Sequence, residues 1–265
     1  MERPRDTGLA APTKRADTFD EIAREYEGKD PATMPMRIYS EVFTLFEILG
    51  DIEGASVLEL ACSDGYFSRH LSEWGAGKVV AIDISPEMIA LAEARHPGPH
   101  PRIEYLVRDA RHMGVLGTFD VVFTPYLLDH AHTRAELVQM CRTAYENLAP
   151  GGCFVALSNH PDSFPPDAVV ERFGIVKQKP TAFRDETPFT LALVMPGETP
   201  QRIPFTGYYY TRETFEAVLE EVGFAKVRWH ELLVSAEGVA EQGEGYWEEY
   251  LEQPCNIAFE ARRRR

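Results

Sequence analysis

Small residues and carboxylates follow an apolar stretch near residue 60. The run Val57-Leu58-Glu59-Leu60 ends in the loop Ala61-Cys62-Ser63-Asp64-Gly65, and an amphipathic segment begins directly afterwards. A strand, a tight turn of small residues and a helix, in this order, are typical of the start of a nucleotide-binding α/β domain. We therefore predict that this loop lies against a bound nucleotide-like ligand.

A second acid indicates which ligand the loop holds. Asp83 ends the next apolar run, and a carboxylate at the tip of a strand can accept hydrogen bonds from both hydroxyls of a ribose. A dinucleotide site needs G-x-G-x-x-G so that the backbone can approach a pyrophosphate. Here Ala61 and Ser63 occupy the first two glycine positions and only Gly65 remains. The pattern predicts an adenosine-type cofactor and makes a nicotinamide dehydrogenase the poorer interpretation.

Length and charge limit the classes of function. The chain has 265 residues, of which 44% are hydrophobic and 26% charged, which suits one α/β domain with a sizeable core. A net charge of −15 repels phosphate backbones, so we expect a neutral or cationic small-molecule substrate and no nucleic acid. No apolar run approaches the roughly 20 residues that span a bilayer, so we expect no membrane association.

Cysteine and histidine spacing gives two further expectations. Four widely separated cysteines without a C-x-x-C pair fit a reduced cytoplasm. We expect no metal site, because His130 and His132 form a pair with no third ligand in sight. The oligomeric state is left open between a monomer and a homodimer.

The periodicity of apolar residues predicts the elements that position these groups. We expect a disordered polar tail at residues 1–16 and a single domain at 17–262, which starts with entry helices within 17–50. Strands and helices then alternate, and a segment at 159–207, rich in proline and aromatic residues, forms a lid-like insertion with a stranded part near 190–194. The predicted strands are residues 56–60, 78–82, 103–107, 119–123, 153–157, 225–233 and 255–261. We expect the hydroxyl side chains of Ser85, Thr133 and Thr211 to cap three of the helices. The fold class is α/β, a doubly wound, seven-stranded, mostly parallel sheet.

The order of these motifs resembles the class I S-adenosylmethionine (SAM) methyltransferases over residues 19–262. The matching motifs are Phe19-Asp20-x-Ile22-Ala23-x-x-Tyr26, the loop at 59–65, Asp109-Ala110, the strand at 119–123, Leu148-Ala149-Pro150-Gly151-Gly152 and Gly223-Phe224. Within that family the chain is similar to toxoflavin-type small-molecule N-methyltransferases, in Met36-Arg37-x-Tyr39 and in residues 126–131, 208–214 and 228–230. The resemblance implies SAM as cofactor, S-adenosylhomocysteine (SAH) as product, and methylation of a heteroaromatic natural product, most simply at nitrogen.

The resemblance also implies a role for each part of the cofactor site. Asp83 would bind the ribose hydroxyls, Asp109 the adenine amino group, and Glu59 the amino end of the methionine. Arg37 would pair with the methionine carboxylate through its fork. The expected cofactor-binding residues are Tyr26, Arg37, Glu59, Ala61, Cys62, Ser63, Gly65, Asp83, Ile84, Met88, Asp109, Ala110, Arg111 and Thr124.

The segment after the fourth strand is expected to face the methyl group, because ligands bind outside the carboxyl ends of parallel strands. Tyr126 would form an aromatic wall there, and His130 would take a proton from the acceptor or act as a structural residue. Asn159 and Tyr209 would line the acceptor pocket. We keep two alternatives: methylation at carbon or oxygen of a secondary metabolite, and a SAM- or SAH-binding protein with a pericyclase-like or binding role.

Overall fold

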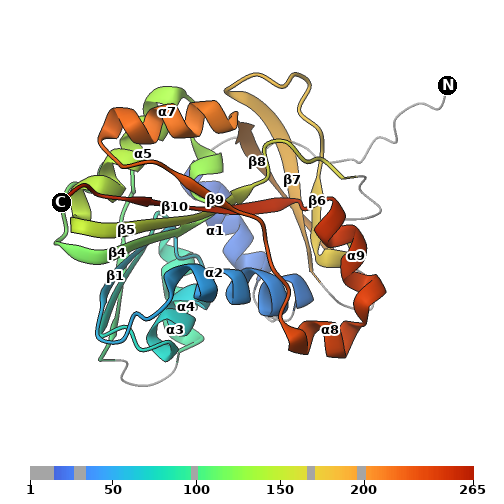
Figure 1. Cartoon of the computed structure of the whole chain (residues 1–265), viewed down its shortest axis with the longest axis horizontal. Coiled ribbons are helices and arrows are strands. Elements are labelled where there is room, and N and C mark those ends of the chain that lie inside the picture. Colours follow the sequence, from blue (N-terminus) through green and yellow to red (C-terminus); the bar gives the residue numbers. More distant parts are fainter. Residues whose placement is uncertain (1–14, 27–33, 97–100, 166–170, 196–200) are drawn as a thin grey trace.

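The main sheet of the computed structural model has seven strands in the order β3-β2-β1-β4-β5-β10-β9 (Figure 1). The structure describes residues 15–26, 34–96, 101–165, 171–195 and 201–265. Strands β1 to β5 are parallel, and β10 is antiparallel to both of its neighbours. The strands are β1 (Ser56–Leu60), β2 (Lys78–Asp83), β3 (Ile103–Val107), β4 (Phe119–Pro125), β5 (Leu148–Asn159), β9 (Arg228–His230) and β10 (Asn256–Arg262).

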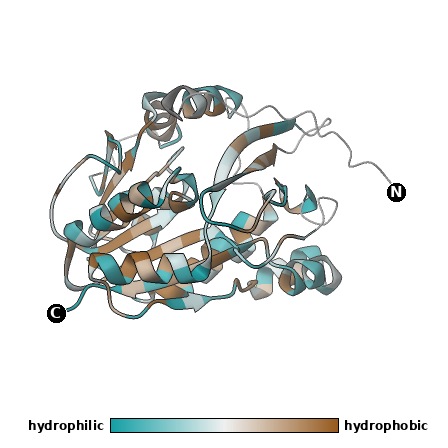
Figure 2. Ribbon diagram, turned by 90° about the horizontal axis from the view of Figure 1, so that it is seen from above, coloured by the Kyte–Doolittle hydropathy of each residue, from teal (hydrophilic) through white to brown (hydrophobic). Residues whose placement is uncertain are grey.

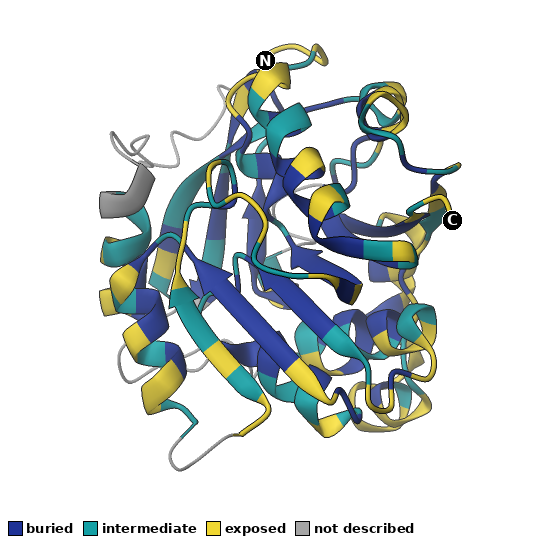
Figure 3. Ribbon diagram, turned by 90° about the vertical axis from the view of Figure 1, so that its left-hand side faces the viewer, coloured by how far each residue is buried: buried dark blue, intermediate teal, exposed yellow. Residues whose placement is uncertain are grey.

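Helices cover both faces of this sheet (Figure 1). On one face lie α2 (Val42–Leu49), α3 (Tyr66–Glu73) and α4 (Pro86–Ala94), and on the other lie α5 (Arg134–Asn147) and α7 (Arg212–Val222). Successive strand residues point to opposite faces, so Val79 belongs to one core and Val80 to the other. Figures 2 and 3 show the result as apolar, buried strands between helices with polar, exposed outer faces.

Several predicted boundaries are confirmed because short-range chemistry sets them. Strands β1 and β3 have the predicted limits. Ser85, Thr133 and Thr211 are the N-caps of α4, α5 and α7, and each side chain accepts a hydrogen bond from a backbone N–H of the first turn. No helix among the described residues is long and apolar enough to cross a membrane.

Other boundaries were wrong. Helix α1 (Arg15–Glu25) begins inside the predicted tail, whose remaining residues, 1–14, lie outside the described part of the chain. Strand β5 starts five residues earlier than predicted, because the chain passes from α5 directly into pairing with β4 at Leu148. The strand predicted at 225–233 shortens to β9, and the helices α8 (Ala236–Gln242) and α9 (Glu244–Glu252) follow it without having been predicted.

The insertion is a second, three-stranded antiparallel sheet in the order β6-β7-β8. Its strands are β6 (Ile175–Lys177), β7 (Thr187–Met195) and β8 (Gln201–Tyr209), so the stranded part predicted near 190–194 was only the centre of β7. Lys177 joins this sheet to the main one: its buried Nζ donates to the backbone oxygens of His160 (2.7 Å), Ser163 (3.1 Å) and Cys255 (3.3 Å).

Replacing Lys177 with methionine should lower the free energy of unfolding by about 2–3 kcal/mol, because three buried carbonyl oxygens lose their donor. Burial lowers the pKa of Lys177 to about 8, and this desolvation cost offsets part of the loss. The measurement is urea unfolding beside Lys179→Met, which alters an exposed lysine two residues away. Equal stability of the two variants would contradict the anchoring role.

Candidate active site

A cavity with about 1380 Å³ of empty space, open mouth included, lies at the carboxyl ends of the central strands. The cavity combines charged and polar side chains with apolar and aromatic ones, as ligand sites do. Most of the predicted site residues line it, although they come from distant parts of the sequence. They are Tyr26, Arg37, Ala61, Cys62, Ser63, Asp83, Ile84, Met88, Asp109, Ala110, Arg111, Tyr126, His130 and Asn159.

The loop after β1 keeps a glycine-type backbone without the usual glycines. Ala61 (φ 60°) and Ser63 (φ 52°) are both in the left-handed region, which costs a residue with a Cβ roughly 1–2 kcal/mol. Gly65 (φ 73°) is also in the left-handed region, and a Cβ there would lie 2.5 Å from the Tyr105 hydroxyl, so this position requires glycine. The substituted loop therefore has the turn that the motif requires.

Asp83 ties this loop to the tip of β2. Its Oδ2 accepts a hydrogen bond from Ser63 N and its Oδ1 accepts one from Ser85 N, both at 2.9 Å. Each carboxylate oxygen can accept a further hydrogen bond, which suits the two hydroxyls of a ribose. Burial raises the pKa of Asp83 to about 6. With Ile84 and Met88 lining the same cavity, these residues fit the adenosine part of SAM.

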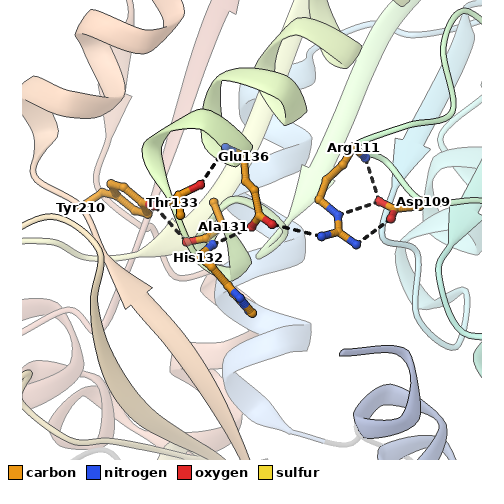
Figure 4. Close-up of polar contacts among 7 residues, drawn as sticks. All are labelled: Asp109, Arg111, Ala131, His132, Thr133, Glu136 and Tyr210. Carbon is orange, nitrogen blue, oxygen red and sulfur yellow. Dashed lines mark hydrogen bonds and ion pairs between the residues drawn. The ribbon is translucent and has the colours of Figure 1, made fainter. Parts of the chain in front are cut away.

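Asp109 is held more firmly than expected (Figure 4). Its Oδ1 accepts hydrogen bonds from the backbone N and Nε of Arg111, both at 2.9 Å, and its Oδ2 accepts one from Nη2 at 2.6 Å. Arg111 Nη1 also donates to Glu136 at 3.1 Å. Burial opposes ionisation of Asp109, but these hydrogen bonds outweigh it and hold its pKa below the ordinary value. Any contact with an adenine amino group therefore uses an oxygen that Arg111 already engages.

Four predicted site residues do not line the cavity: Glu59, Gly65, Thr124 and Tyr209. Thr124 donates to the backbone oxygen of Leu60 at 2.9 Å, and Glu59 is wholly buried and accepts a hydrogen bond from the Ser68 hydroxyl. Glu59 and Thr124 thus support the end of β1 from positions outside the cavity. The position of Glu59 argues against a direct contact with the cofactor.

Tyr209 misses the cavity because of strand geometry. It shares a face of β8 with Phe205, which lines the cavity, but lies four residues further along, or about 13 Å. There it packs against Phe183, at a ring distance of 5.6 Å. Its neighbour Tyr210 donates to the backbone oxygen of Ala131 at 2.9 Å and so ties the end of β8 to the loop after β4 (Figure 4).

Replacing Glu59 with glutamine should make stability less dependent on pH. Burial raises the pKa of Glu59 to about 8, so its stabilising contribution is complete below pH 4.5 and is lost as pH rises through 8. Glutamine resembles the protonated acid, and the variant should gain about 3 kcal/mol over the wild type between pH 5 and pH 8. Urea unfolding of both proteins at pH 5 and at pH 8 measures their difference in free energy of unfolding. A difference that is the same at both pH values would contradict the raised pKa of Glu59.

Sequence reasoning missed the other residues that line the cavity. They are Phe19, Ile22, Met34, Met36, Glu41, Asp64, Tyr66, Phe67, Arg108, Pro125, Leu127, Met140, Ile175, Leu193 and Phe205. The ring of His130 lies between those of Phe19 (5.1 Å) and Phe205 (5.9 Å), so α1 and the insertion meet over the loop after β4. An acid inside an apolar helical stretch was the one available signal for Glu41.

Two reactive possibilities lose support. Burial raises the pKa of the Cys62 thiol well above its ordinary value, so this loop cysteine is a packing residue rather than a nucleophile. Within the described ranges, no group of three His, Cys, Asp or Glu side chains is placed to hold a metal ion.

Comparison with known proteins supports the same interpretation. Residues 57–152 match the family described as "Methyltransferase domain". The chain is 27% identical over 173 residues to the N-demethylindolmycin N-methyltransferase of Streptomyces griseus (64% of this chain, 70% of that one). It is 26% identical over 139 residues to the ubiquinone biosynthesis O-methyltransferase of Xanthomonas oryzae pv. oryzae. This match covers 51% of this chain and 56% of that relative.

The fold is shared with solved methyltransferases. The CcbJ methyltransferase of Streptomyces caelestis superposes with a TM-score of 0.66 at 15% identity, over 96% of this chain and all of that one. The matched domain contains the loop, Asp83 and Asp109, whose geometry fits the adenosine part of SAM. Residues 57–152 are therefore a SAM-dependent methyltransferase domain, and the chain has the fold of the solved methyltransferases.

Proposed function

We propose that this enzyme methylates a nitrogen of a small heteroaromatic natural product. The observation that carries the proposal is the lining of the cavity, which combines the residues proposed to bind adenosine with apolar and aromatic side chains from α1 and the insertion. The similarity to an N-methyltransferase named for N-demethylindolmycin supports a natural-product acceptor and nitrogen as the target.

The chain's own residues would bind, orient and exclude water. When bound, SAM supplies an electrophilic methyl group on a sulfonium. Asp83 would hold the ribose and Arg37 the methionine carboxylate, while Tyr126 and Asn159 line the acceptor half. Phe19 and Phe205 shield this half from solvent beside His130, so alignment and desolvation would supply most of the rate.

Methylation at oxygen is the second candidate, because an O-methyltransferase is also among the relatives. The two are separated by incubating the pure chain with methyl-labelled SAM and matched panels of N–H indoles, N–H pteridines and phenols. Label on nitrogen, located by NMR of the product, is the expected result. Label confined to phenols would favour the second candidate. SAH binding without transfer to any compound would favour the non-methylating alternative.

Replacing His130 with alanine should lower kcat less than about tenfold for an acceptor methylated at a pyridine-type nitrogen, such as one in a pteridine ring, because that free lone pair needs little help from a base. The ring is packed between two aromatic side chains and serves mainly as part of the wall. Initial rates with labelled SAM and the acceptor found in the panel test this. A loss beyond about 10³-fold would identify general base catalysis instead.

A further inference from the structure

A buried carboxylate in the cavity is only half satisfied. Glu41 lies on a π-helical turn (Arg37–Glu41), has no exposed surface and lines the cavity. Its Oε1 accepts hydrogen bonds from the Tyr126 hydroxyl and from Asn256 Nδ2, the latter at 3.2 Å. Its Oε2 has no hydrogen-bond partner among the described residues, and Arg37 Nε, at 4.0 Å, is beyond hydrogen-bond distance. One acceptor position of Glu41 thus lacks a donor.

The position of this cluster separates it from the adenosine-binding residues. Asp83 ends β2 and Asp109 follows β3, at one side of the sheet. Tyr126 follows β4, and Asn256 at the start of β10 is paired with Asn159 at the end of β5. Because β4, β5 and β10 are neighbours on the other side of β1, Glu41 is anchored in the acceptor half of the cavity.

The arrangement carries costs that the nearby charge of Arg37 offsets only in part. A buried acceptor without a donor loses its hydrogen bonds to water and gains none in return. Tyr126 has a left-handed backbone (φ 63°), which is strained for a residue with a Cβ. Asn159, which lines the same cavity, adds a second buried oxygen, Oδ1, that lacks a hydrogen bond. Burial raises the pKa of Glu41, whereas the charge of Arg37 lowers it. In the ionised form both vacant atoms are acceptors, so the complementary ligand is a hydrogen-bond donor.

We propose that Glu41 recognises the acceptor molecule through a polar N–H hydrogen. Its Oε2 would accept this hydrogen bond, Asn159 Oδ1 would accept a second from the same molecule, and Tyr126 and Asn256 hold Oε1 so that Oε2 faces the ligand. This deepens, and rests on, the proposed methylation of a heteroaromatic compound. It restricts the acceptor to molecules that carry at least one N–H group in addition to the atom that receives the methyl group.

Glu41→Gln is the direct test, because it preserves shape while reversing one hydrogen bond. The amide oxygen can still accept from Tyr126 and Asn256, which leaves an N–H donor where Oε2 offers an acceptor. Calorimetric titration of SAH-saturated protein would compare lumazine, which carries ring N–H groups, with 1,3-dimethyllumazine, and any panel compound that binds with its N-methyl counterpart. The dissociation constant of SAH is measured separately.

We expect the wild type to prefer the N–H compound and Glu41→Gln to bind it about 10–100-fold more weakly, with SAH binding unchanged. Glu47→Gln, on an exposed position of the following helix, is the matched control and should change neither constant. Tyr126→Phe provides a second variant, which keeps the carboxylate but removes one of its orienting hydrogen bonds, and it should show a smaller loss of the same preference.

Three results would overturn the inference. An unchanged N–H preference in both Glu41→Gln and Tyr126→Phe would show that the carboxylate does not read the acceptor. A parallel loss of SAH affinity would place Glu41 in the cofactor half. If the wild type methylates N–H compounds while the variants behave normally, this inference fails alone. If the wild type neither binds nor methylates any panel compound, the proposed function fails and this inference with it.

Discussion

Replacing Asp83 with alanine should weaken SAH binding about 10²–10³-fold. Two charge-assisted hydrogen bonds to the ribose would be lost, each worth roughly 1.5–3 kcal/mol, and every 1.4 kcal/mol is a factor of ten in affinity. The loop after β1 would also lose its tie to β2, the 2.9 Å hydrogen bond from Ser63 N. Calorimetry with SAH at pH 8, where an acid with a pKa of about 6 is ionised, measures the change.

Asp120→Ala is the matched control for this prediction. Asp120 also accepts a backbone hydrogen bond, from Ser56 N at 2.9 Å, and a side-chain hydrogen bond from the same serine at 2.7 Å. It lies near the amino end of β4, whereas the cavity lies at the carboxyl ends of the strands. It should cost stability but not SAH affinity. An Asp83→Ala protein that is folded and binds SAH normally would require a different cofactor position.

Arg37→Met should separate the two ends of the cofactor. We expect SAH affinity to fall about 100-fold, because Arg37 is the charged group that we propose for the methionine carboxylate. 5′-Methylthioadenosine, which has the adenosine part but no amino-acid group, should bind the variant within about twofold of the wild type. The Arg37 side chain is 13% exposed, lies over the Tyr66 ring at 5.6 Å and lines the cavity. Calorimetry with both ligands gives the comparison.

Arg24→Met controls for loss of a positive charge, since Arg24 is an exposed arginine whose ion pair with Glu87 spans 3.7 Å. It should bind both ligands normally. Equal weakening of SAH and 5′-methylthioadenosine by Arg37→Met would mean that Arg37 acts through the fold, because its removal also leaves Glu41 without its charged neighbour. Unchanged affinity for both would remove Arg37 from the cofactor site.

The substituted loop shows how a sequence departure can leave the backbone intact. Ala61 and Ser63 stand where glycines are usual, yet both adopt left-handed conformations and the turn is formed. Hydrogen bonds from the flanking residues hold this conformation, Cys62 N to Ile82 O at 2.8 Å and Ser63 N to Asp83 Oδ2 at 2.9 Å. The turn in this methyltransferase domain therefore does not depend on glycine at these positions.

By itself the sequence determined the parts of this protein that depend on near neighbours. An apolar run followed by small residues specified β1 and its loop, an acid at the end of β2 specified Asp83, and hydroxyl side chains specified the caps of three helices. Such features need information from only a few consecutive residues, so their chemistry could be predicted with the right residue numbers.

Only the tertiary structure decided which polar groups are already paired and which are free. Asp109 follows β3 as predicted, but the fork of Arg111 engages both of its oxygens. Tyr209 lies on the cavity-facing side of β8 yet too far along it, whereas Glu41 becomes a site residue through partners 85 and 215 positions away. Pairing of this kind depends on the relative placement of strands, helices and insertion, which residue patterns within single elements do not contain.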